Sequence, residues 1–422
     1  MRILYTTPFV PYPPTYGGTM ISYHHLKGLS ERGHELVMIL PLRRPGDEEA
    51  AHVLRDLGQV RAVPAMKKSV VRLALEALSP HSSLRIAHHR FAAVEAETAR
   101  ALREEKPFDA VYLDTLFSAY LLPFLRKSIP ATPVVLLELN VESQVVDRVA
   151  KRGRGWWARF AGSWETSRLR AAERLVHSEV DRVLTLSEED ARAVRATPKA
   201  RAHKIGPGIT TFIGQTIPPP PQERIVLFFG SFQWPPNVDA AEWMAREIWP
   251  RVISREPSAR LVLAGQDPRR KISHLAAANS SIEVTGFVDD ATQRTRASTV
   301  CVAPLRAGGG VRIKILEALA NERPVVATTL GAEGLDLSPG QHALIADDAD
   351  SFAGEIVRLL QHPEEARRIA AQGRRFVEAR FAWPQVIQRV EEMLEAAVRE
   401  RAQNDVMRRA ASRSPAPPSP AS

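Results

Sequence analysis

The chain of 422 residues has one cysteine, Cys301, and no apolar run long enough to cross a membrane. A single cysteine excludes a disulfide within the chain. Its place in the run TVCVAPL predicts a small buried side chain in a reducing cytoplasm. The first residues, MRILYTTPFVPYPP, are interrupted by threonines and prolines, so we expect neither a signal peptide nor a membrane anchor.

Two further absences disfavour two classes of function. The dinucleotide fingerprint GxGxxG is missing after the first strand expected in either half, where TTPFVPYPP and GSFQWPPN stand instead, which disfavours a nicotinamide dehydrogenase. The formal charge of +9 comes with neither a zinc-ligand cluster nor an aromatic platform, which disfavours a nucleic-acid binder. Most basic residues are interspersed with acids and indicate solvated helix faces, although excess positive charge also suits anionic membranes or phosphorylated substrates.

Apolar runs alternate with helical patterns along most of the chain, which predicts parallel sheets. In the first half the expected strands are RILYTT, HELVMIL, DAVYL, VVLLEL and DRVLTL, with a helix over 19–32 that ends at Gly33. In the second half they are IVLFFG, ARLVLAG, IEVTGF, VCVAPL and PVVATT, with helices over 238–254, 289–298 and 311–321. Ser187 is expected to cap the helix of SEEDARAV, with Asp190 at its third position.

A proline-rich break divides the chain. Four successive prolines, Pro218 to Pro221, cannot join a sheet and favour a stiff extended linker over 206–222. We therefore expect an α/β fold with one doubly wound domain over 1–205 and a second over 223–383. Further helices are expected over 350–361, 363–380 and 384–402. The remaining residues, 403–422, hold too little apolar surface to become ordered, which predicts a disordered tail.

Four segments carry a family resemblance: PPTYGGTMISYHHLKGLSERGHEL, VLTLSEEDARAV, FGSFQWPPNVDAAEW and APLRAGGGVRIKILEALANERPVVATTLGAEGL. Together with the two-domain pattern they resemble the GT-B glycosyltransferases, particularly the retaining family 4 group, over nearly the whole chain. The resemblance implies two Rossmann-like domains facing a cleft, the first on the acceptor side and the second binding a nucleotide sugar. It also leaves open that helix 384–402 packs back on the first domain.

The segment LRAGGGVRIKILEALA is the most specific of these signals. Its three glycines lie between a buried strand and a helix, so backbone N–H groups and the positive end of the helix dipole can face a diphosphate. Arg312 and Lys314, in the first helical turns, are expected to neutralise the phosphates of a leaving nucleotide. Glu317 lies one turn further, and the resemblance implies that it accepts hydrogen bonds from the ribose. The alternative is an exposed ion pair between Lys314 and Glu317.

The chain departs from the family pattern at two places. Many members carry a glutamate that contacts the sugar where this chain has Gly309, so no side chain exists there to act as a nucleophile. A histidine often precedes the position of Asn140, whereas this chain has Leu139. Asn140 and Glu142 still follow a buried strand at its carboxyl end and are our further catalytic candidates, with helix capping as the alternative.

The full set of candidates combines catalytic and donor-binding residues. Asn237 also suits the N-cap of the following helix, and Phe287 also suits core packing. We expect no metal site and no cofactor beyond the nucleotide-sugar substrate. The catalytic candidates are Arg312, Lys314, Asn140 and Glu142, and the donor-binding candidates are Gly17, Gly18, Gly230, Asn237, Gly286, Phe287, Arg306, Gly308, Gly309, Gly310 and Glu317.

These residues predict a glycosyltransferase that moves a hexose-type sugar from a nucleoside diphosphate to a glycan or lipid-linked glycan, with retention, in polysaccharide or glycoconjugate biosynthesis. Two alternatives stay open: a catalytically silent sugar-nucleotide-binding or assembly protein, and a GT-B sugar-nucleotide epimerase. The segment 151–177 mixes three tryptophans with many arginines. It indicates either contact with the inner face of the membrane or a long amphipathic helix packed on its own domain.

Overall fold

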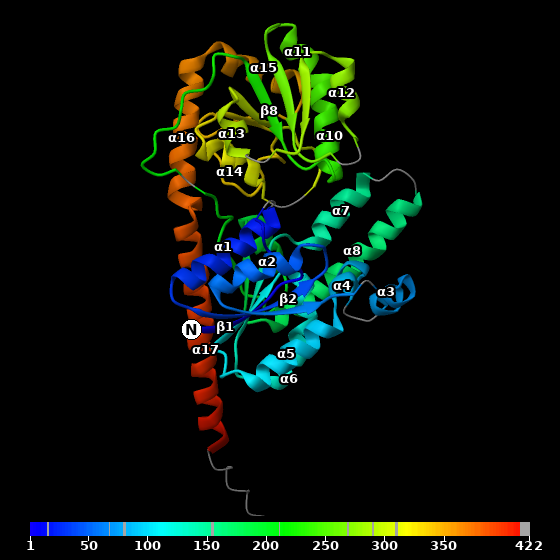
Figure 1. The fold of residues 1–422 in the computed structure, drawn as a ribbon, viewed down its shortest axis with the longest axis vertical. Coiled ribbons are helices and arrows are strands. Elements are labelled where there is room, and N and C mark those ends of the chain that lie inside the picture. Colours follow the sequence, from blue (N-terminus) through cyan, green and yellow to red (C-terminus); the bar gives the residue numbers. More distant parts are fainter. Residues whose placement is uncertain are drawn as a thin grey trace, which may run out of the picture. The chain divides into compact units, whose positions relative to one another are not determined.

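The computed structural model describes residues 1–14, 17–66, 68–78, 82–152, 156–210, 212–267, 270–288, 291–308 and 311–413. The chain divides into two compact units. Unit 1 comprises Met1–Ser143, Trp164–Ile205 and Ile387–Ser422, and unit 2 comprises Gln144–Ser163 and Gly206–Val386. Both belong to the α/β class, and their elements are drawn in Figure 1.

Unit 1 contains a parallel seven-stranded sheet in the order β3-β2-β1-β4-β5-β6-β7. All five strands expected in this half are present, and their central residues are buried, as the apolar runs predicted. The sequence analysis missed β3, whose residues are half exposed, and β7, which has three residues. The strands are β1 (Arg2–Thr6), β2 (Glu35–Leu42), β3 (Gln59–Pro64), β4 (Ala110–Asp114), β5 (Val134–Glu138), β6 (Arg182–Thr185) and β7 (Ala202–Lys204).

One predicted helix end and one predicted helix start are present in unit 1. Gly33 has φ 83° just after α1, and the Ser187 side chain accepts a hydrogen bond from the Asp190 backbone N–H at the start of α9, so both assignments are confirmed. The helices that lie wholly or partly in this unit are α1 (Gly17–Glu31), α2 (Asp47–Val53), η1 (Leu54–Leu57), α3 (Val70–Ala77), α4 (Leu84–His89), α5 (Ala92–Glu104), η2 (Leu116–Leu121), α6 (Leu122–Ser128), α7 (Glu142–Arg152), α8 (Trp156–Glu179), α9 (Glu188–Arg195) and α17 (Trp383–Arg413).

Unit 2 contains a parallel six-stranded sheet in the order β10-β9-β8-β11-β12-β13, so two doubly wound sheets are confirmed. The strands are β8 (Ile225–Phe229), β9 (Arg260–Ala264), β10 (Ile282–Gly286), β11 (Val300–Ala303), β12 (Val325–Ala327) and β13 (Leu344–Ile345). Besides parts of α7 and α8, the helices are α10 (Pro235–Trp243), the π-helical segment η3 (Met244–Ile248), α11 (Trp249–Ile253), α12 (Ser273–Ala278), α13 (Ala291–Arg296), α14 (Ile313–Ala320), α15 (Ala349–Gln361), α16 (Pro363–Phe381) and the start of α17 (Trp383–Arg413).

Successive side chains of a strand point to opposite faces of the sheet, so this sheet has two cores, one on each face. Val226 and Phe228 pack in a cluster with α10 and α15, whereas Leu227 packs on the opposite face in a cluster with α14 and α16. Cys301 belongs to the second cluster and is buried, which confirms its predicted role as a small core residue. Burial raises the pKa of its thiol to about 11.

Helix α17 runs beyond its predicted end. Residues 403–413 are helical, so the tail predicted as disordered does not start at 403, and residues 414–422 lie outside the described part of the chain. Helix α17 is drawn in Figure 1, and from Ile387 onward it belongs to unit 1. There Glu391 accepts a hydrogen bond from His34 at 2.9 Å. The helix is mostly charged, but its buried positions recur at helical spacing and hold it on the unit. No described helix is long and apolar enough to span a bilayer.

Candidate functional site

The strand order of unit 2 marks a place for a ligand. Strands β8 and β11 are neighbours, while the chain proceeds from β8 toward β10 on one side and from β11 toward β13 on the other. A crevice forms outside the carboxyl ends of the strands at such a switch point, and open α/β sheets bind ligands there. The loop after β8 begins with Gly230, and the loop after β11 leads through Gly308 to α14. Both loops were singled out from the sequence, and the topology brings them to one edge.

Three glycines line the strand ends at this edge. The Gly230 N–H donates to the Ala264 carbonyl oxygen, and the Gly265 N–H donates to that of Gly286, both at 2.9 Å. Gly265 has φ 139°, and a Cβ on it would overlap the Gly230 carbonyl oxygen. The sequence analysis missed Gly265, although ARLVLAG ends its strand as IVLFFG does. The side chain of Phe287 is 58% exposed, so the alternative of core packing is wrong.

The Lys314 ammonium group lies directly above the end of β8. Its Nζ donates to Asn237 Oδ1 at 3.0 Å and lies 4.7 Å from the centre of the Phe228 ring. The Asn237 Nδ2 donates in turn to the Ser231 carbonyl oxygen at 2.8 Å, which fixes the amide. A Cβ on Gly230 would come within 2.8 Å of Lys314 Nζ, so a side chain at this position would displace the lysine ammonium group.

This arrangement corrects the alternative role of Asn237. Helix α10 starts at Pro235, and its N-cap is Trp234, which makes no side-chain capping bond. Two prolines occupy the first helical positions, where a missing N–H costs nothing, so the helix begins two residues before Asn237. Asn237 is buried inside the first turn and is free to hold Lys314.

Glu317 follows Lys314 by one turn of α14 and is partly buried beside it. Among the described residues the two side chains form no ion pair within 4.0 Å, so the surface ion pair that the sequence left open is not present. Burial and the charge of Arg312 lower the pKa of Lys314 to about 7, and burial raises the pKa of Glu317 to about 7. A pair of groups poised near neutrality in a strand-end crevice is a feature of ligand sites.

Trp234 forms a wall of the site that the sequence analysis did not assign. Arg312 is buried, with 4% of the residue exposed, and its guanidinium lies 5.7 Å from the centre of the Trp234 ring. Gly308 has φ 96°, and a Cβ on it would lie 2.6 Å from Trp234 Cη2. The loop therefore passes close over an aromatic ring before α14 begins at Ile313. Gly309 and Gly310 lie outside the described residues.

Arg306 is placed differently from the other donor-binding candidates. Its Nη2 donates to Asp239 Oδ1 at 2.9 Å, and its guanidinium lies 4.9 Å from the centre of the Trp243 ring. The pocket that it lines includes Asp239 and Lys271 but neither Lys314 nor Glu317. The structure thus holds Arg306 in a bidentate ion pair on the surface of α10.

Arg148 is a contact of the glycine loop that the sequence did not reveal. Its Nη1 donates to the Gly308 carbonyl oxygen at 3.1 Å, and its guanidinium binds Glu333 with N–O distances of 2.7 and 3.0 Å. Arg148 lies on α7, in the part of that helix that belongs to unit 2. Nothing in the sequence near Arg148 marks it, because its partners are 160 and 185 residues away.

Substituting Arg148 with alanine is expected to raise the KM for the sugar donor about tenfold with little change in kcat. The loop loses a charge-assisted hydrogen bond to Gly308, and such bonds contribute about 1.5–3 kcal/mol, reduced here because the pair is partly exposed. Steady-state kinetics with varied donor would measure the effect. Lys151→Ala is the matched control, since Lys151 is exposed on the same helix and pairs with Asp147 of that helix. Equal KM values in both variants would contradict the role.

The candidates of unit 1 follow β1 and β5. Gly17 and Gly18 open α1, in the loop region after β1, which adjoins β4 at the switch point of this sheet. Glu142 is the first residue of α7; it is buried and pairs with Arg85 at 2.9 Å. Burial raises the pKa of Glu142, and Asn140 donates a hydrogen bond to it. The structure therefore ties Asn140 and Glu142 into the start of α7.

A buried polar cluster supports that helix start. The Ser143 N–H and hydroxyl donate to the two carboxylate oxygens of Glu173 at 2.9 and 2.5 Å, and His177 Nε2 pairs with Glu138 at 2.6 Å. Burial raises the pKa of Glu173 to about 7, while the Glu138 carboxylate raises that of His177. Glu173 and His177 lie on the buried side of α8, where the sequence showed only an ordinary mixture of charges.

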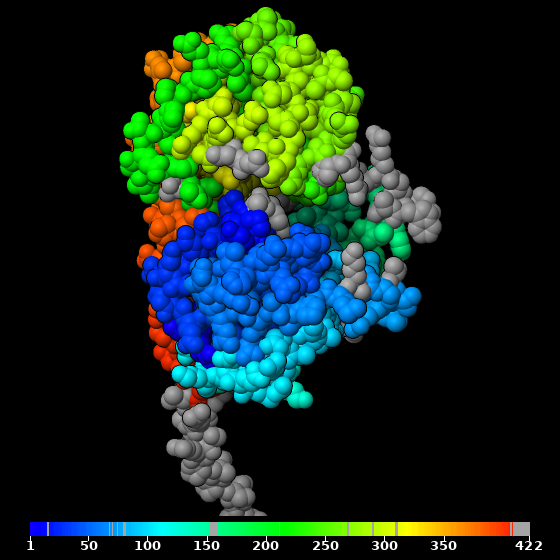
Figure 2. All heavy atoms as spheres, in the orientation of Figure 1, coloured from blue at the N-terminus to red at the C-terminus, as the bar shows by residue number. Residues whose placement is uncertain are grey.

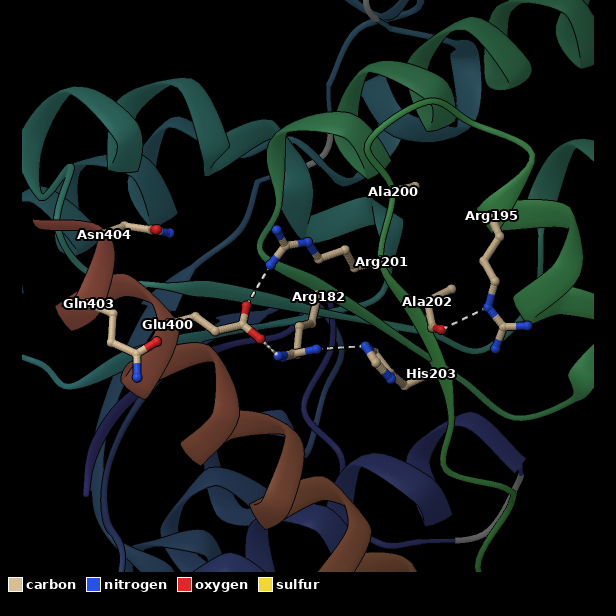
Figure 3. Close-up of a pocket in the computed structure, with 9 residues that line it drawn as sticks. All are labelled: Arg182, Arg195, Ala200, Arg201, Ala202, His203, Glu400, Gln403 and Asn404. Carbon is tan, nitrogen blue, oxygen red and sulfur yellow. Dashed lines mark hydrogen bonds and ion pairs between the residues drawn. The ribbon is translucent and has the colours of Figure 1, made fainter. Parts of the chain in front are cut away.

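Figure 3 shows a second polar pocket of unit 1, at the amino ends of β6 and β7. Glu400 accepts hydrogen bonds from Arg182 and Arg201, and Arg195 donates to the Ala202 carbonyl oxygen at 3.1 Å. The arginines are thus engaged with groups of the chain itself. The amino ends of parallel strands are the edge away from the usual ligand crevice, so we assign this pocket to the attachment of α17.

The segment 151–177 is largely the helix α8, as its amphipathic alternative predicted. Residues 153–155 and the side chains of Trp156 and Trp157 lie outside the described part. Phe160 and Trp164 are exposed, whereas Glu165 is buried and accepts hydrogen bonds from the backbone N–H groups of Leu84 and Arg85.

Comparisons with known proteins cover both units. Residues 17–208 match the family described as glycosyl transferase 4-like domain, and residues 223–362 match glycosyl transferases group 1. The chain is 22% identical over 400 residues to an uncharacterized 44.6 kDa protein in the cps region of Klebsiella pneumoniae, covering 90% of this chain and 96% of that protein.

Two further proteins are similar to the chain. It is 26% identical over 161 residues to a GDP-mannose-dependent monoacylated alpha-(1-6)-phosphatidylinositol monomannoside mannosyltransferase of Corynebacterium glutamicum, covering 36% of this chain and 42% of that protein. The structure of Anabaena Alr3699/HepE in complex with UDP and glucose aligns with a TM-score of 0.65 at 15% identity, covering 94% of this chain and all of that one.

Proposed function

Because the chain belongs to the GT-B glycosyltransferases of group 1, with a 4-like N-terminal part, we propose that it transfers a sugar from a nucleoside diphosphate to a glycan or lipid-linked glycan, with retention. It is a glycosyltransferase enzyme, and sugar transfer in polysaccharide synthesis is its broad activity. The observation that carries the finer proposal is the group of residues at the end of β8, where Lys314 lies above Gly230 and Glu317 lies one turn further.

In the proposed reaction the diphosphate occupies the glycine-lined start of α14. Arg312 and Lys314 stabilise the charge that develops on the departing phosphate oxygen, and Glu317 accepts hydrogen bonds from the ribose. The bond between the anomeric carbon and the phosphate oxygen breaks while the acceptor oxygen attacks from the same face, and a phosphate oxygen takes the acceptor proton. Because position 309 is glycine, this route needs no carboxylate nucleophile.

The bases and sugars that similar proteins use differ, since one is named for GDP-mannose and another was solved with UDP and glucose. A panel of UDP, GDP and dTDP sugars would therefore be screened by thermal shift, followed by detection of transfer product and anomeric configuration by NMR. We expect one donor class to stabilise the protein and to be consumed only with an acceptor. Binding without turnover, or isomerisation of the donor by the protein alone, would contradict the proposal.

The titration of Lys314 gives a pH dependence for nucleotide binding. Its pKa of about 7 means that it loses its proton as the pH rises above neutrality. A bound diphosphate favours the charged form, so binding takes up a proton, and the Kd of the preferred nucleoside diphosphate is expected to rise up to about tenfold per pH unit. Calorimetry between roughly pH 7.5 and 9 would measure the slope. Lys314→Met is expected to abolish it, and an equal slope in both proteins would refute the assignment.

The lipid-linked form of the acceptor would bring the enzyme to a membrane surface. The predicted contact through the segment 151–177 stays a prediction, supported by the exposed rings of Phe160 and Trp164. Pelleting with vesicles that contain a lipid-linked acceptor, compared with vesicles that lack it, would test this part of the proposal.

A further inference from the structure

Unit 1 has a switch point of its own, between β1 and β4. The chain proceeds from β1 toward β3 on one side of the sheet and from β4 toward β7 on the other. Open α/β sheets bind ligands outside the carboxyl ends of such neighbouring strands. Asp114 is the last residue of β4, and it is fully buried, with 0% of the residue exposed. A buried ionisable group at this place in the fold is a candidate for a role in function.

A polar cluster between the sheet and α1 surrounds the Asp114 carboxyl group. The Tyr5 hydroxyl of β1 donates to Asp114 Oδ2 at 2.9 Å, and the Tyr5 ring stacks on the Tyr112 ring with centroids 5.0 Å apart. On α1, His25 Nδ1 forms a hydrogen bond of 2.9 Å with the Tyr112 hydroxyl. Ser22 precedes His25 by three residues on the same buried side of α1, and its hydroxyl faces Asp114. The cluster therefore joins β1, β4 and α1.

Two hydroxyl groups beside Asp114 each have a second acceptor. The Ser22 hydroxyl donates to the Gly18 carbonyl oxygen in the first turn of α1 at 3.0 Å. The Thr7 hydroxyl, just after β1, also faces Asp114 and donates to the Phe9 carbonyl oxygen at 3.1 Å. A hydroxyl has one proton to donate, and an ionised carboxylate can only accept. The charge of Asp114 therefore decides where both protons are directed.

The fold keeps this carboxyl group at a cost. Among the described residues Asp114 Oδ1 is buried without a hydrogen-bond partner. Burial raises the pKa of Asp114 to about 6, and the nearby hydroxyls offset this only in part. The next residue, Thr115, has φ 68° and ψ 157°, a strained backbone for a β-branched side chain. Strain and a poorly satisfied carboxyl group at one strand end are typical of functional sites.

We propose that Asp114 is a positioning residue for sugar transfer: as a carboxylate it holds the Ser22 and Thr7 hydroxyls, and so shapes the opening of α1 that receives the sugar of the donor. The inference rests on the proposed function and adds to it a group of unit 1. Once the hydroxyls turn to Asp114, the two carbonyl oxygens they held can accept from sugar hydroxyls. Gly17 and Gly18 are partly exposed, and Figure 2 shows the region of α1, in blue, at the surface of unit 1.

Sugar transfer is expected to depend on pH through Asp114. Its pKa of about 6 means that the carboxyl group is ionised at roughly pH 7 and mostly neutral at roughly pH 5, so the transfer rate is expected to fall about tenfold between them. The titratable groups around it stay neutral over this range, because burial raises the pKa of Tyr5 and Tyr112 and lowers that of His25 to about 3. Asp114→Asn is expected to show the slow rate throughout and to lack this step.

The test measures initial rates of the full chain with UDP-glucose or GDP-mannose as the donor and an octyl glycoside as the acceptor. Ser22→Ala keeps the carboxyl group but removes its link to α1, and its rate at neutral pH is expected to fall several-fold. Thr98→Val is the matched control, because the buried Thr98 hydroxyl on α5 likewise donates to a carbonyl oxygen four residues earlier, that of Val94. The same pH step in Asp114→Asn as in the wild type would overturn the inference.

Thermal unfolding distinguishes a positioning role from a structural one. Because folding raises the pKa of Asp114 above its usual 3.8, its ionisation lowers the stability of the folded state as the pH rises through about 6. The melting temperature of Asp114→Asn at roughly pH 8 is therefore expected to equal or exceed that of the wild type. A lower value would make Asp114 a structural residue and would also overturn the inference. Failure of the proposed function would appear instead as a wild type that transfers no sugar, with the melting temperatures as expected here.

Discussion

Replacing Lys314 with alanine is expected to lower the rate of sugar transfer by about 10²–10³-fold, similar to the removal of one preorganised donor from an active site. The Nζ group is held by Asn237 and faces the end of β8, so it needs no rearrangement to meet a diphosphate. The effect arises in the transition state, because the phosphate gains charge as it leaves, and kcat is therefore expected to fall more than the donor affinity.

The melting temperature of Lys314→Ala distinguishes a loss of catalysis from damage to the fold. Burial already disfavours the charged form of Lys314, and no carboxylate lies within ion-pair distance of it among the described residues, so removing it breaks no buried ion pair. The melting temperature is expected to change by a few degrees at most. Lys27→Ala is a suitable control, since Lys27 is exposed on α1 and forms a surface ion pair with Glu31, at 3.8 Å, outside the site. Full transfer activity of Lys314→Ala would remove the residue from the mechanism.

Gly265→Ala is expected to destabilise unit 2 by about 2–6 kcal/mol, since a left-handed backbone and an overpacked contact each cost about 1–3 kcal/mol. The φ of 139° is unfavourable for alanine, and the new methyl group would overlap the Gly230 carbonyl oxygen. Because Gly230 lies under Lys314, the displacement is also expected to weaken nucleotide binding at temperatures where the protein stays folded.

A second glycine separates the two causes. Gly340 has φ 74° in the same unit, but a Cβ there would meet nothing within 4 Å. Gly340→Ala therefore carries backbone strain without the collision, and its melting temperature and nucleotide affinity are expected to fall much less. Thermal unfolding and calorimetric titration of both variants would measure the difference. If the two variants behaved alike, the packing between the ends of β8 and β9 would not matter for the site.

The strands were predictable because nearly all of their side chains are apolar. Runs such as IVLFFG and VCVAPL are buried on both faces of a parallel sheet, so their apolar character is continuous and visible along the chain. The missed strand β3, QVRAVP, lies at the edge of its sheet and alternates with polar residues, which removed the signal. Helix caps were predictable for the same local reason, since Ser187 contacts the N–H only three residues away.

Other parts of the site depend on contacts that cannot be predicted from neighbouring residues in the sequence. The N-cap of α10 was misplaced because Asn237 has the right side chain, while the two prolines before it allowed an earlier start. The engagement of Arg306 with Asp239, and of Arg148 with Gly308, joins residues 67 and 160 positions apart. The sequence predicted a donor-binding role for Arg306 and no role for Arg148.

The sequence by itself determined the two doubly wound sheets, the buried cysteine and the loop whose glycines precede Lys314 and Glu317, because each depends on periodicity or on neighbours within a few residues. Only the tertiary structure decided that Gly230 and Gly265 pack against each other beneath Lys314, that Trp234 lies under the loop, and that Ser22 of α1 faces Asp114 at the end of β4. Those outcomes depend on which strand ends and helices are brought together, and that is set by packing over the whole unit.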